Sequence, residues 1–129
     1  MNNTTKKRIV LIEDEAVLVD VLQKKLTGEG FDVLVARDGE EGIEKLKELR
    51  DDLPDLILLD IIMPKKDGFA VLEFMKGDKK ISKVPVIIIS NSGQPVEITR
   101  AKEMGVMDWL VKTEFDPQEV MEKVHKYLG

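Results

Sequence analysis

The sequence predicts an α/β fold in which a parallel sheet lies between two layers of helices. Short apolar runs typical of buried strands alternate with segments whose apolar residues recur at helical spacing, and the connections between them are short. Strands that alternate with helices in this way pair in parallel, with helices over both faces of the sheet. The chain of 129 residues is long enough for one domain with a single core.

Five strands are expected. The third, LILL, is wholly apolar, as expected of a strand that is covered on both faces. The fourth contains Pro85 near its start, where a missing backbone donor costs least. The predicted strands cover residues 8–12, 31–35, 56–59, 84–89 and 107–111.

A helix is expected after each strand. The first ends near Gly28, the second begins at Gly39, and the third ends at Gly77, all positions where glycine is typical of helix boundaries. Pro95 and Pro117 stand in the first turns of the fourth and fifth helices, where proline is well tolerated. We expect residues 1–7 to form a flexible tail and residues 8–129 to form the domain.

Composition limits the class of protein. Hydrophobic residues make up 43% and charged residues 35%, which is typical of a globular chain. The net charge of −5 favours no nucleic-acid partner, since the phosphate backbone would repel it. There is no cysteine, and no apolar run is long enough to cross a bilayer. We therefore expect a cytoplasmic protein that binds no membrane.

Polar residues stand where the predicted strands end. Glu13 and Asp14 follow the first strand, Asp60 follows the third, Ser90 the fourth and Lys112 the fifth. In an open parallel sheet, ligands bind outside the carboxyl ends of the strands. These side chains are therefore expected to form one site. The next acid, Glu15, is interpreted instead as a residue of the first helical turn, where the helix dipole favours a negative charge.

The grouping indicates phosphoryl-transfer chemistry. Three carboxylates in one crevice need a cation to stay ionised together, and Mg²⁺ suits oxygen ligands of this kind. A lysine and a serine hydroxyl can bind phosphate oxygens, and a carboxylate can itself be the nucleophile. Asp60 is preferred as the nucleophile because it stands alone, whereas Glu13 and Asp14 form a pair suited to holding metal.

At this point the chain resembles a known family. The stretches that carry the resemblance are IEDE at 12–15, LLDIIMPKKDG at 58–68, IIISNSG at 87–93 and WLVK at 109–112. They are similar to the receiver domains of two-component response regulators, in particular the single-domain, chemotaxis-type members. The resemblance implies a flavodoxin-like (βα)5 three-layer sandwich with a five-stranded parallel sheet of order 2-1-3-4-5.

The resemblance also implies a role for each site residue. Asp60 accepts a phosphoryl group from a histidine kinase, a phosphotransfer protein or a small phosphodonor. Glu13 and Asp14 hold Mg²⁺, or Mn²⁺ as an alternative, together with Asp60 and the backbone carbonyl of Ile62. Lys112 and Ser90 bind the phosphoryl oxygens.

A switch and an output surface are implied as well. Ser90 moves toward the phosphoryl group, and the rotamer of Trp109 follows that movement. Residues 95–128 form the face that signals to a downstream target protein, or through which a monomer pairs weakly with a second copy. The protein is then a stand-alone signalling switch and no enzyme beyond its own phosphorylation and slow dephosphorylation.

Two features depart from the family pattern or tune it. Thr113 replaces the proline that usually follows the active-site lysine, so the Lys112–Thr113 bond is expected to be trans. Ile62 and Ser92 stand at positions through which the family tunes hydrolysis. Isoleucine cannot orient an attacking water, which predicts a long-lived phosphorylated state.

Three other functions compete with this interpretation. A phosphorylation-independent, receiver-like adaptor would bind its partners constitutively. A flavin or nucleotide binder would place glycine in the first strand–helix turn, where this chain has Glu13, Asp14 and Glu15. A phosphatase with an aspartate nucleophile would need a second acid soon after Asp60, where Ile61 and Ile62 stand.

Overall fold

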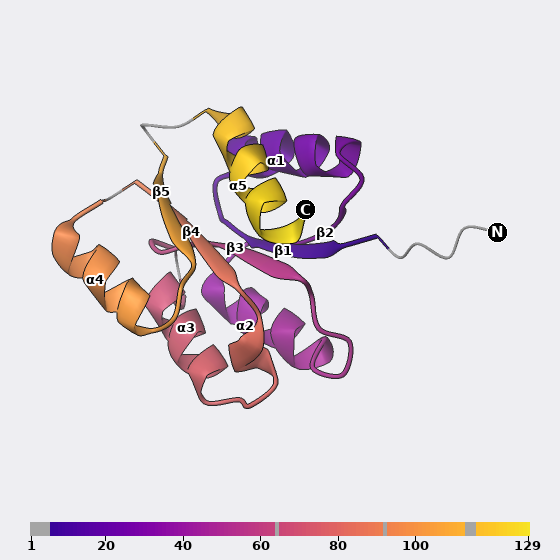
Figure 1. The fold of residues 1–129 in the computed structure, drawn as a ribbon. Coiled ribbons are helices and arrows are strands. Elements are labelled where there is room, and N and C mark those ends of the chain that lie inside the picture. Colours follow the sequence, from indigo (N-terminus) through magenta and orange to yellow (C-terminus); the bar gives the residue numbers. More distant parts are fainter. Residues whose placement is uncertain (1–5, 64, 92, 113–115) are drawn as a thin grey trace.

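Five parallel strands form one sheet in the order β2-β1-β3-β4-β5, and helices cover both of its faces (Figure 1). The computed structural model describes residues 6–63, 65–91, 93–112 and 116–129. This is the flavodoxin-like arrangement expected from the sequence. The elements in chain order are β1 Arg8–Ile12, α1 Ala16–Gly28, β2 Asp32–Ala36, α2 Gly39–Glu48, β3 Leu56–Asp60, α3 Gly68–Lys76, the 3₁₀ turn η1 Ile81–Lys83, β4 Val86–Ser90, α4 Pro95–Glu103, β5 Asp108–Val111 and α5 Pro117–Leu128.

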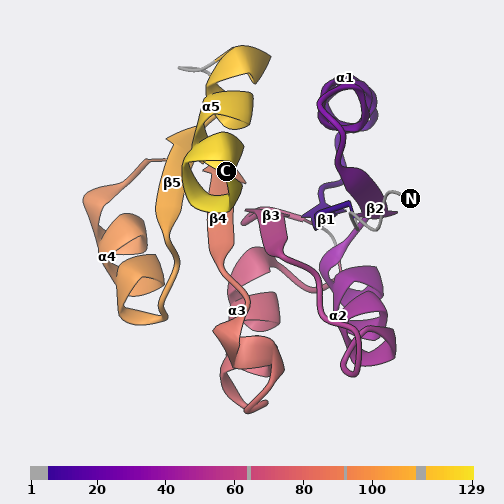
Figure 2. The ribbon, with the colours of Figure 1, turned by 45° about the vertical axis from the view of Figure 1, so that its right-hand side comes forward.

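The helices divide into two layers. α1 and α5 lie on one face of the sheet, and α2, α3 and α4 lie on the other (Figure 2). The central strand β3 supplies both cores, because successive side chains of a strand point to opposite faces. Leu56 and Leu58 pack with α1 and α5, whereas Ile57 and Leu59 pack with α2 and α3. This explains why the run is apolar at every position.

Several predicted strand boundaries differ from the structure by one or two residues; β2 runs on to Ala36, and β5 begins at Asp108 rather than at residue 107. Phe31 precedes β2, because its backbone N–H donates to the carbonyl oxygen of Leu26 and closes the end of α1. β4 begins after Pro85, whose carbonyl oxygen accepts from the N–H of Ile57. At the other end β3 includes Asp60 and β4 includes Ser90, since both residues continue the backbone pairing beyond the last apolar side chain.

The register of the sheet brings the polar residues to one edge. Ile12 pairs with Leu59, so Glu13 follows β1 level with Asp60 at the end of β3. Asp60 pairs in turn with Ile89, the neighbour of Ser90. The backbone N–H of the residue after β5, Lys112, donates to the carbonyl oxygen of Ser90 at 2.6 Å. The carboxyl ends of four strands therefore meet here.

The segment after β3 turns back closely against the acid. Asp67 caps α3 by accepting a hydrogen bond from the N–H of Ala70 at 2.9 Å. The N–H of the first helical residue, Gly68, donates to the carbonyl oxygen of Ile61 at 2.8 Å. α3 therefore starts directly against the backbone that carries Asp60.

The chain is already attached to the sheet just before β1, where the carbonyl oxygen of Lys7 accepts from the N–H of Asp32. Residues 1–5, which form most of the expected tail, lie outside the described ranges. Within those ranges, none of the helices is both long and apolar enough to cross a lipid bilayer.

Candidate functional site

Glu13 is a fully buried acid at the end of β1. Its backbone N–H donates to the carbonyl oxygen of Ala36 at 2.9 Å, which holds it beside β2. Its Oε2 accepts a hydrogen bond from the backbone N–H of Glu15 at 2.9 Å. Burial, together with the nearby charge of Asp60, raises the pKa of Glu13 to about 7 against the opposing effects of the Glu15 N–H and Lys112.

Asp60 closes the central strand with only 3% of its side chain exposed. Its Oδ1 accepts from the backbone N–H of Ile62 at 3.3 Å, and its Oδ2 lies 3.0 Å from Nζ of Lys112. Burial raises the pKa of Asp60, although the charge and hydrogen bond of Lys112 act in the opposite direction. A carboxylate is therefore held at a fixed position with one oxygen facing a cation.

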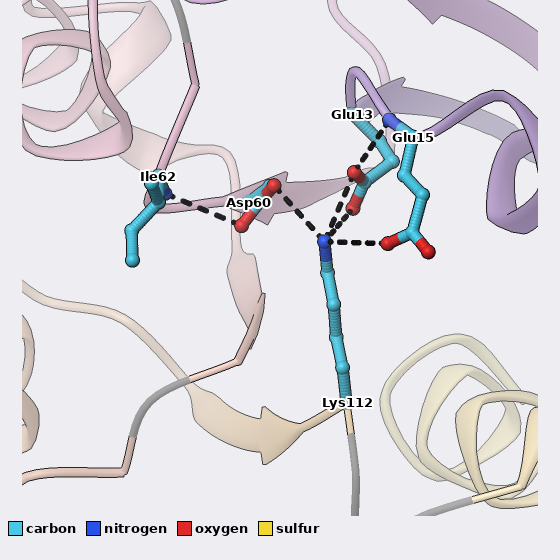
Figure 3. A network of polar contacts seen from close by, with 5 residues as sticks. All are labelled: Glu13, Glu15, Asp60, Ile62 and Lys112. Carbon is cyan, nitrogen blue, oxygen red and sulfur yellow. Dashed lines mark hydrogen bonds and ion pairs between the residues drawn. The ribbon is translucent and has the colours of Figure 1, made fainter.

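Lys112 extends from the end of β5 into the group of acids (Figure 3). Its Nζ lies 2.9 Å from Oε1 of Glu13, 3.0 Å from Oδ2 of Asp60 and 3.4 Å from Oε1 of Glu15. Burial by itself would lower the pKa of the lysine, but the hydrogen bonds and charges of Glu13 and Asp60 outweigh it, so that the pKa is raised. The ammonium group therefore stays charged and offsets part of the negative charge of the buried acids.

The acids have the composition of a site for a hard divalent cation. Glu13, Asp14 and Asp60 each offer a carboxylate oxygen, and these oxygens lie within 4.8 Å of one another. Oε1 of Glu13 is buried and accepts no hydrogen bond from the described residues, although the ammonium group of Lys112 is close. A buried carboxylate oxygen that faces an ammonium group without a well-aligned hydrogen bond suits an ion that binds oxygen, and Mg²⁺ commonly uses one or two such carboxylates. These residues could therefore hold the expected metal.

The other predicted residues are divided between the site and its surroundings. Ser90 is fully buried as the last residue of β4, next to the position that pairs with Asp60. The backbone N–H of Ile62 donates to Asp60, and the residue as a whole is 60% exposed. Ser92 and Thr113 lie outside the described ranges, and with them the geometry of the Lys112–Thr113 bond.

Trp109 lies away from the acids, on β5. It pairs in the sheet with Ile88, two residues before Ser90, and packs against the core beneath α4. Together with Ile98 and Lys102 of α4 it lines a surface pocket. The indole is thus placed between β5 and α4, on the face that was expected to signal.

The sequence did not indicate the contact between Glu15 and Lys112. Glu15 was interpreted as an acid stabilised by the dipole of α1, but its carboxylate lies against Lys112. The lysine itself was expected to bind phosphoryl oxygens, and in this structure it lies among the acids. The available signal was the position of Glu15 directly after Asp14, at the carboxyl edge of the sheet.

The fold and the acidic site together define a receiver domain. The family model described as "Response regulator receiver domain" matches residues 9–125, and the chain belongs to this family. Receiver domains act as signalling switches rather than as conventional enzymes. The resemblance to receiver domains that was stated from the sequence motifs is therefore confirmed.

Individual relatives agree with this assignment. The chain is 33% identical over 126 residues to the DNA-binding response regulator MtrA of Mycobacterium tuberculosis, covering 98% of this chain and 52% of MtrA. The chain spans about half the length of the curated relatives it matches. Because MtrA is named as a DNA-binding regulator, the expected absence of a nucleic-acid partner stays a prediction.

Solved structures give the same fold. The CheX–CheY–BeF3–Mg²⁺ complex of Borrelia burgdorferi matches with a TM-score of 0.84 and 30% identity, covering 95% of this chain and 90% of the matched chain. The chemotaxis protein CheY4 of Vibrio cholerae matches with a TM-score of 0.85, covering 95% and 99%. Its identity of 22% supports likeness of fold alone.

Proposed function

We propose that this domain is a Mg²⁺-dependent phosphoryl-accepting switch whose acceptor is Asp60. The observation that carries the proposal is the buried carboxylate of Asp60, 3.0 Å from Nζ of Lys112 and clustered with Glu13 and Asp14. An acid, a lysine and a cation-binding pair at one point are the parts that phosphoryl transfer needs, since that reaction depends mainly on positioning and charge neutralisation.

In the proposed reaction an Oδ atom of Asp60 attacks the phosphorus of a phosphohistidine or a small acyl phosphate. The new O–P bond forms as the bond between phosphorus and the donor breaks, and the electron pair stays with the donor. Mg²⁺, or Mn²⁺ in its place, supplies positive charge to the phosphoryl oxygens when it is bound by Glu13, Asp14, Asp60 and the carbonyl of Ile62. Lys112 exchanges a carboxylate for a phosphoryl oxygen, and the hydroxyl of Ser90 donates to another.

Phosphorylation would then act on the face formed by α4, β5 and α5. The phosphoryl group adds roughly two negative charges, which draw the hydroxyl of Ser90 toward it and favour one of two arrangements of Trp109. Residues 95–128 present this change to a downstream partner protein or to a second copy of the chain. The proposed donor is a histidine kinase or phosphotransfer protein, and the proposed mode is that of a stand-alone, chemotaxis-type regulator, with Ile62 and Ser92 tuning hydrolysis.

The first experiment uses Trp109 as the reporter. Its fluorescence is titrated with Mg²⁺ and then with beryllofluoride, in the wild type, in Asp60→Asn and in Asp67→Asn, which keeps a capping side chain at the start of α3. We expect a saturable change in the wild type and in the Asp67 variant, and no beryllofluoride response in the Asp60 variant. Intact mass after treatment with acetyl phosphate should show one added phosphoryl group only where Asp60 is present.

A wild-type protein that gains no phosphoryl group and shows no fluorescence response would contradict the proposal. The phosphorylation-independent adaptor would then be the better description, because partner binding would not depend on the acid site.

A further inference from the structure

Glu15 contacts the acidic site through both its backbone and its side chain. Its N–H donates to Oε2 of Glu13 at 2.9 Å, and its Oε1 lies 3.4 Å from Nζ of Lys112. Its side chain is 56% exposed, whereas that of Lys112 is 8% exposed. Glu15 therefore stands at the mouth of the site and reaches the buried ammonium group from the solvent side.

The position of Glu15 would ordinarily serve a different purpose. It is the N-cap residue of α1, a position at which the shorter acid aspartate commonly accepts a hydrogen bond from the first helical turn. Asp38, Asp67 and Asp116 do this at the starts of α2, α3 and α5, with distances of 2.7, 2.9 and 3.1 Å. Among the described residues the Glu15 side chain makes no such bond, and its carboxylate faces Lys112 instead.

The carboxylates around Lys112 differ in what else they can bind. Glu13 and Asp60 belong to the cluster whose oxygens could hold a cation, and Glu15 lies outside that cluster. When Glu13 and Asp60 hold a divalent cation, the cation takes up part of their negative charge, and less of it is left to neutralise Lys112. A largely buried ammonium group that loses its partners is costly, because its desolvation is no longer compensated.

We propose that Glu15 is the positioning residue that retains Lys112 in the site while Glu13 and Asp60 bind the cation. The inference rests on the proposed function of the site, and it adds a residue that acts on the cation only through the lysine. Glu15 should therefore favour Mg²⁺ binding without being a ligand. Its contribution should disappear when the lysine is absent.

A double-mutant cycle distinguishes an effect of Glu15 that depends on Lys112 from a direct effect of Glu15 on the cation. Mg²⁺ dissociation constants are measured by titration calorimetry at about 0.15 M salt, where interactions between exposed charges more than roughly 8 Å apart are largely screened. The proteins are the wild type, Glu15→Gln, Lys112→Met and the double variant. Glu40→Gln, in the first turn of α2 at the same edge of the sheet, is the matched control for loss of one exposed negative charge.

We expect Glu15→Gln to weaken Mg²⁺ binding about fivefold in the presence of Lys112 and less than about twofold in the Lys112→Met background, a coupling in the range measured for residues in contact. Glu40→Gln should change the affinity less than about twofold. An equal loss in both backgrounds would show that Glu15 acts as a ligand or through its field, and would overturn the inference. An unchanged affinity in Glu15→Gln would overturn it as well.

A second measurement needs no change at Lys112. In ¹⁵N-labelled protein with saturating Mg²⁺, the ammonium signal of Lys112 should stay sharp in the wild type and broaden through exchange with water in Glu15→Gln. Equal line widths in the two proteins would contradict retention by Glu15.

Asp14→Asn distinguishes failure of the inference from failure of the proposed function. If Asp14→Asn loses Mg²⁺ binding but the cycle shows no coupling, the metal centre stands and the role of Glu15 is wrong. If Asp14→Asn binds Mg²⁺ as the wild type does, the proposed metal centre is itself wrong.

Discussion

Gly68 leaves no room for a side chain beside the proposed acceptor. A Cβ atom there would lie 2.5 Å from the carbonyl oxygen of Asp60 and 2.7 Å from Cα of Ile61. Because both neighbours are backbone atoms, relief would require movement of the segment that carries Asp60. We expect Gly68→Ala to destabilise the domain by about 1–3 kcal/mol in urea unfolding, and to slow phosphorylation by acetyl phosphate.

Gly77 provides the matched control for that substitution. It follows α3 with φ −79°, and an added Cβ would meet no described atom closer than 3.5 Å. Gly77→Ala should therefore be neutral or stabilising by up to about 1 kcal/mol, since alanine restricts the unfolded chain. Equal effects of the two substitutions on stability would contradict the conclusion that Gly68 is required because a Cβ atom there would clash with the backbone.

Ile62 stands two residues after the proposed acceptor Asp60, and its apolar side chain cannot orient a hydrolytic water. The residue is 60% exposed, and its backbone N–H is bound to Asp60. We expect phosphorylated Asp60 to persist far longer than seconds without a phosphatase, and Ile62→Asn to shorten that lifetime because an amide can orient water. Loss of ³²P label over time measures both, with Ile62→Val as a control that should resemble the wild type. A wild-type half-life of seconds would contradict this prediction.

At the scale of elements, Asp78 connects the segment between α3 and η1 to the residues just after α2 through hydrogen bonds. Its Oδ1 accepts from the backbone N–H of Lys80 at 2.8 Å and of Ile81 at 3.0 Å, and its Oδ2 accepts from Nε of Arg50 at 2.7 Å. The hydrogen bond from Ile81 and the pairing with Arg50 lower the pKa of Asp78 from 3.8 to about 2.

This shift predicts a pH dependence of stability. A carboxylate whose pKa is lower in the folded state contributes stability above its ordinary value of 3.8, and loses it as the pH falls toward about 2. The free energy of unfolding of Asp78→Asn should therefore lie below that of the wild type near pH 6. The two values should converge as the pH falls toward about 2. Urea unfolding across this range measures the difference, and curves that stay parallel would contradict the assignment.

At the scale of the whole molecule, the sheet separates two cores. Leu22 of α1 is fully buried in one and Leu46 of α2 is fully buried in the other. We expect each leucine-to-alanine substitution to cost about 2–5 kcal/mol, depending on how far its cavity collapses. Because the two leucines belong to separate core clusters on opposite faces of the sheet, the double variant should cost the sum within about 0.5 kcal/mol, measured by denaturant unfolding. A markedly smaller or larger sum would indicate coupling through the sheet.

Apolar patterning predicted the elements well but their ends less well. The run at 56–59 was identified as a central strand because all of its residues are apolar, and both cores use it. Phe31 was placed in the second strand, since an apolar residue that closes a helix looks the same in sequence as one that opens a strand. The turn at 81–83 was not expected, because three residues carry no readable periodicity.

The sequence predicted which residues form the candidate site, but not which acids contact Lys112. The carboxyl-end rule grouped Glu13, Asp14 and Asp60, and the structure clusters their oxygens. The same rule said nothing about which acid the lysine would contact. Glu15 was therefore assigned to the helix dipole, although its side chain lies against Lys112.

The sequence alone determined the alternation of strands and helices, the edge of the sheet at which the polar residues end, and the family. These properties follow from local patterns, because period, helix boundaries and strand ends depend on near neighbours. Only the tertiary structure decided the partners of Lys112, which meets Glu13 across 99 positions and Asp60 across 52. Such contacts depend on the register of neighbouring strands and on the reach of one long side chain, and neither is written in any short stretch of the chain.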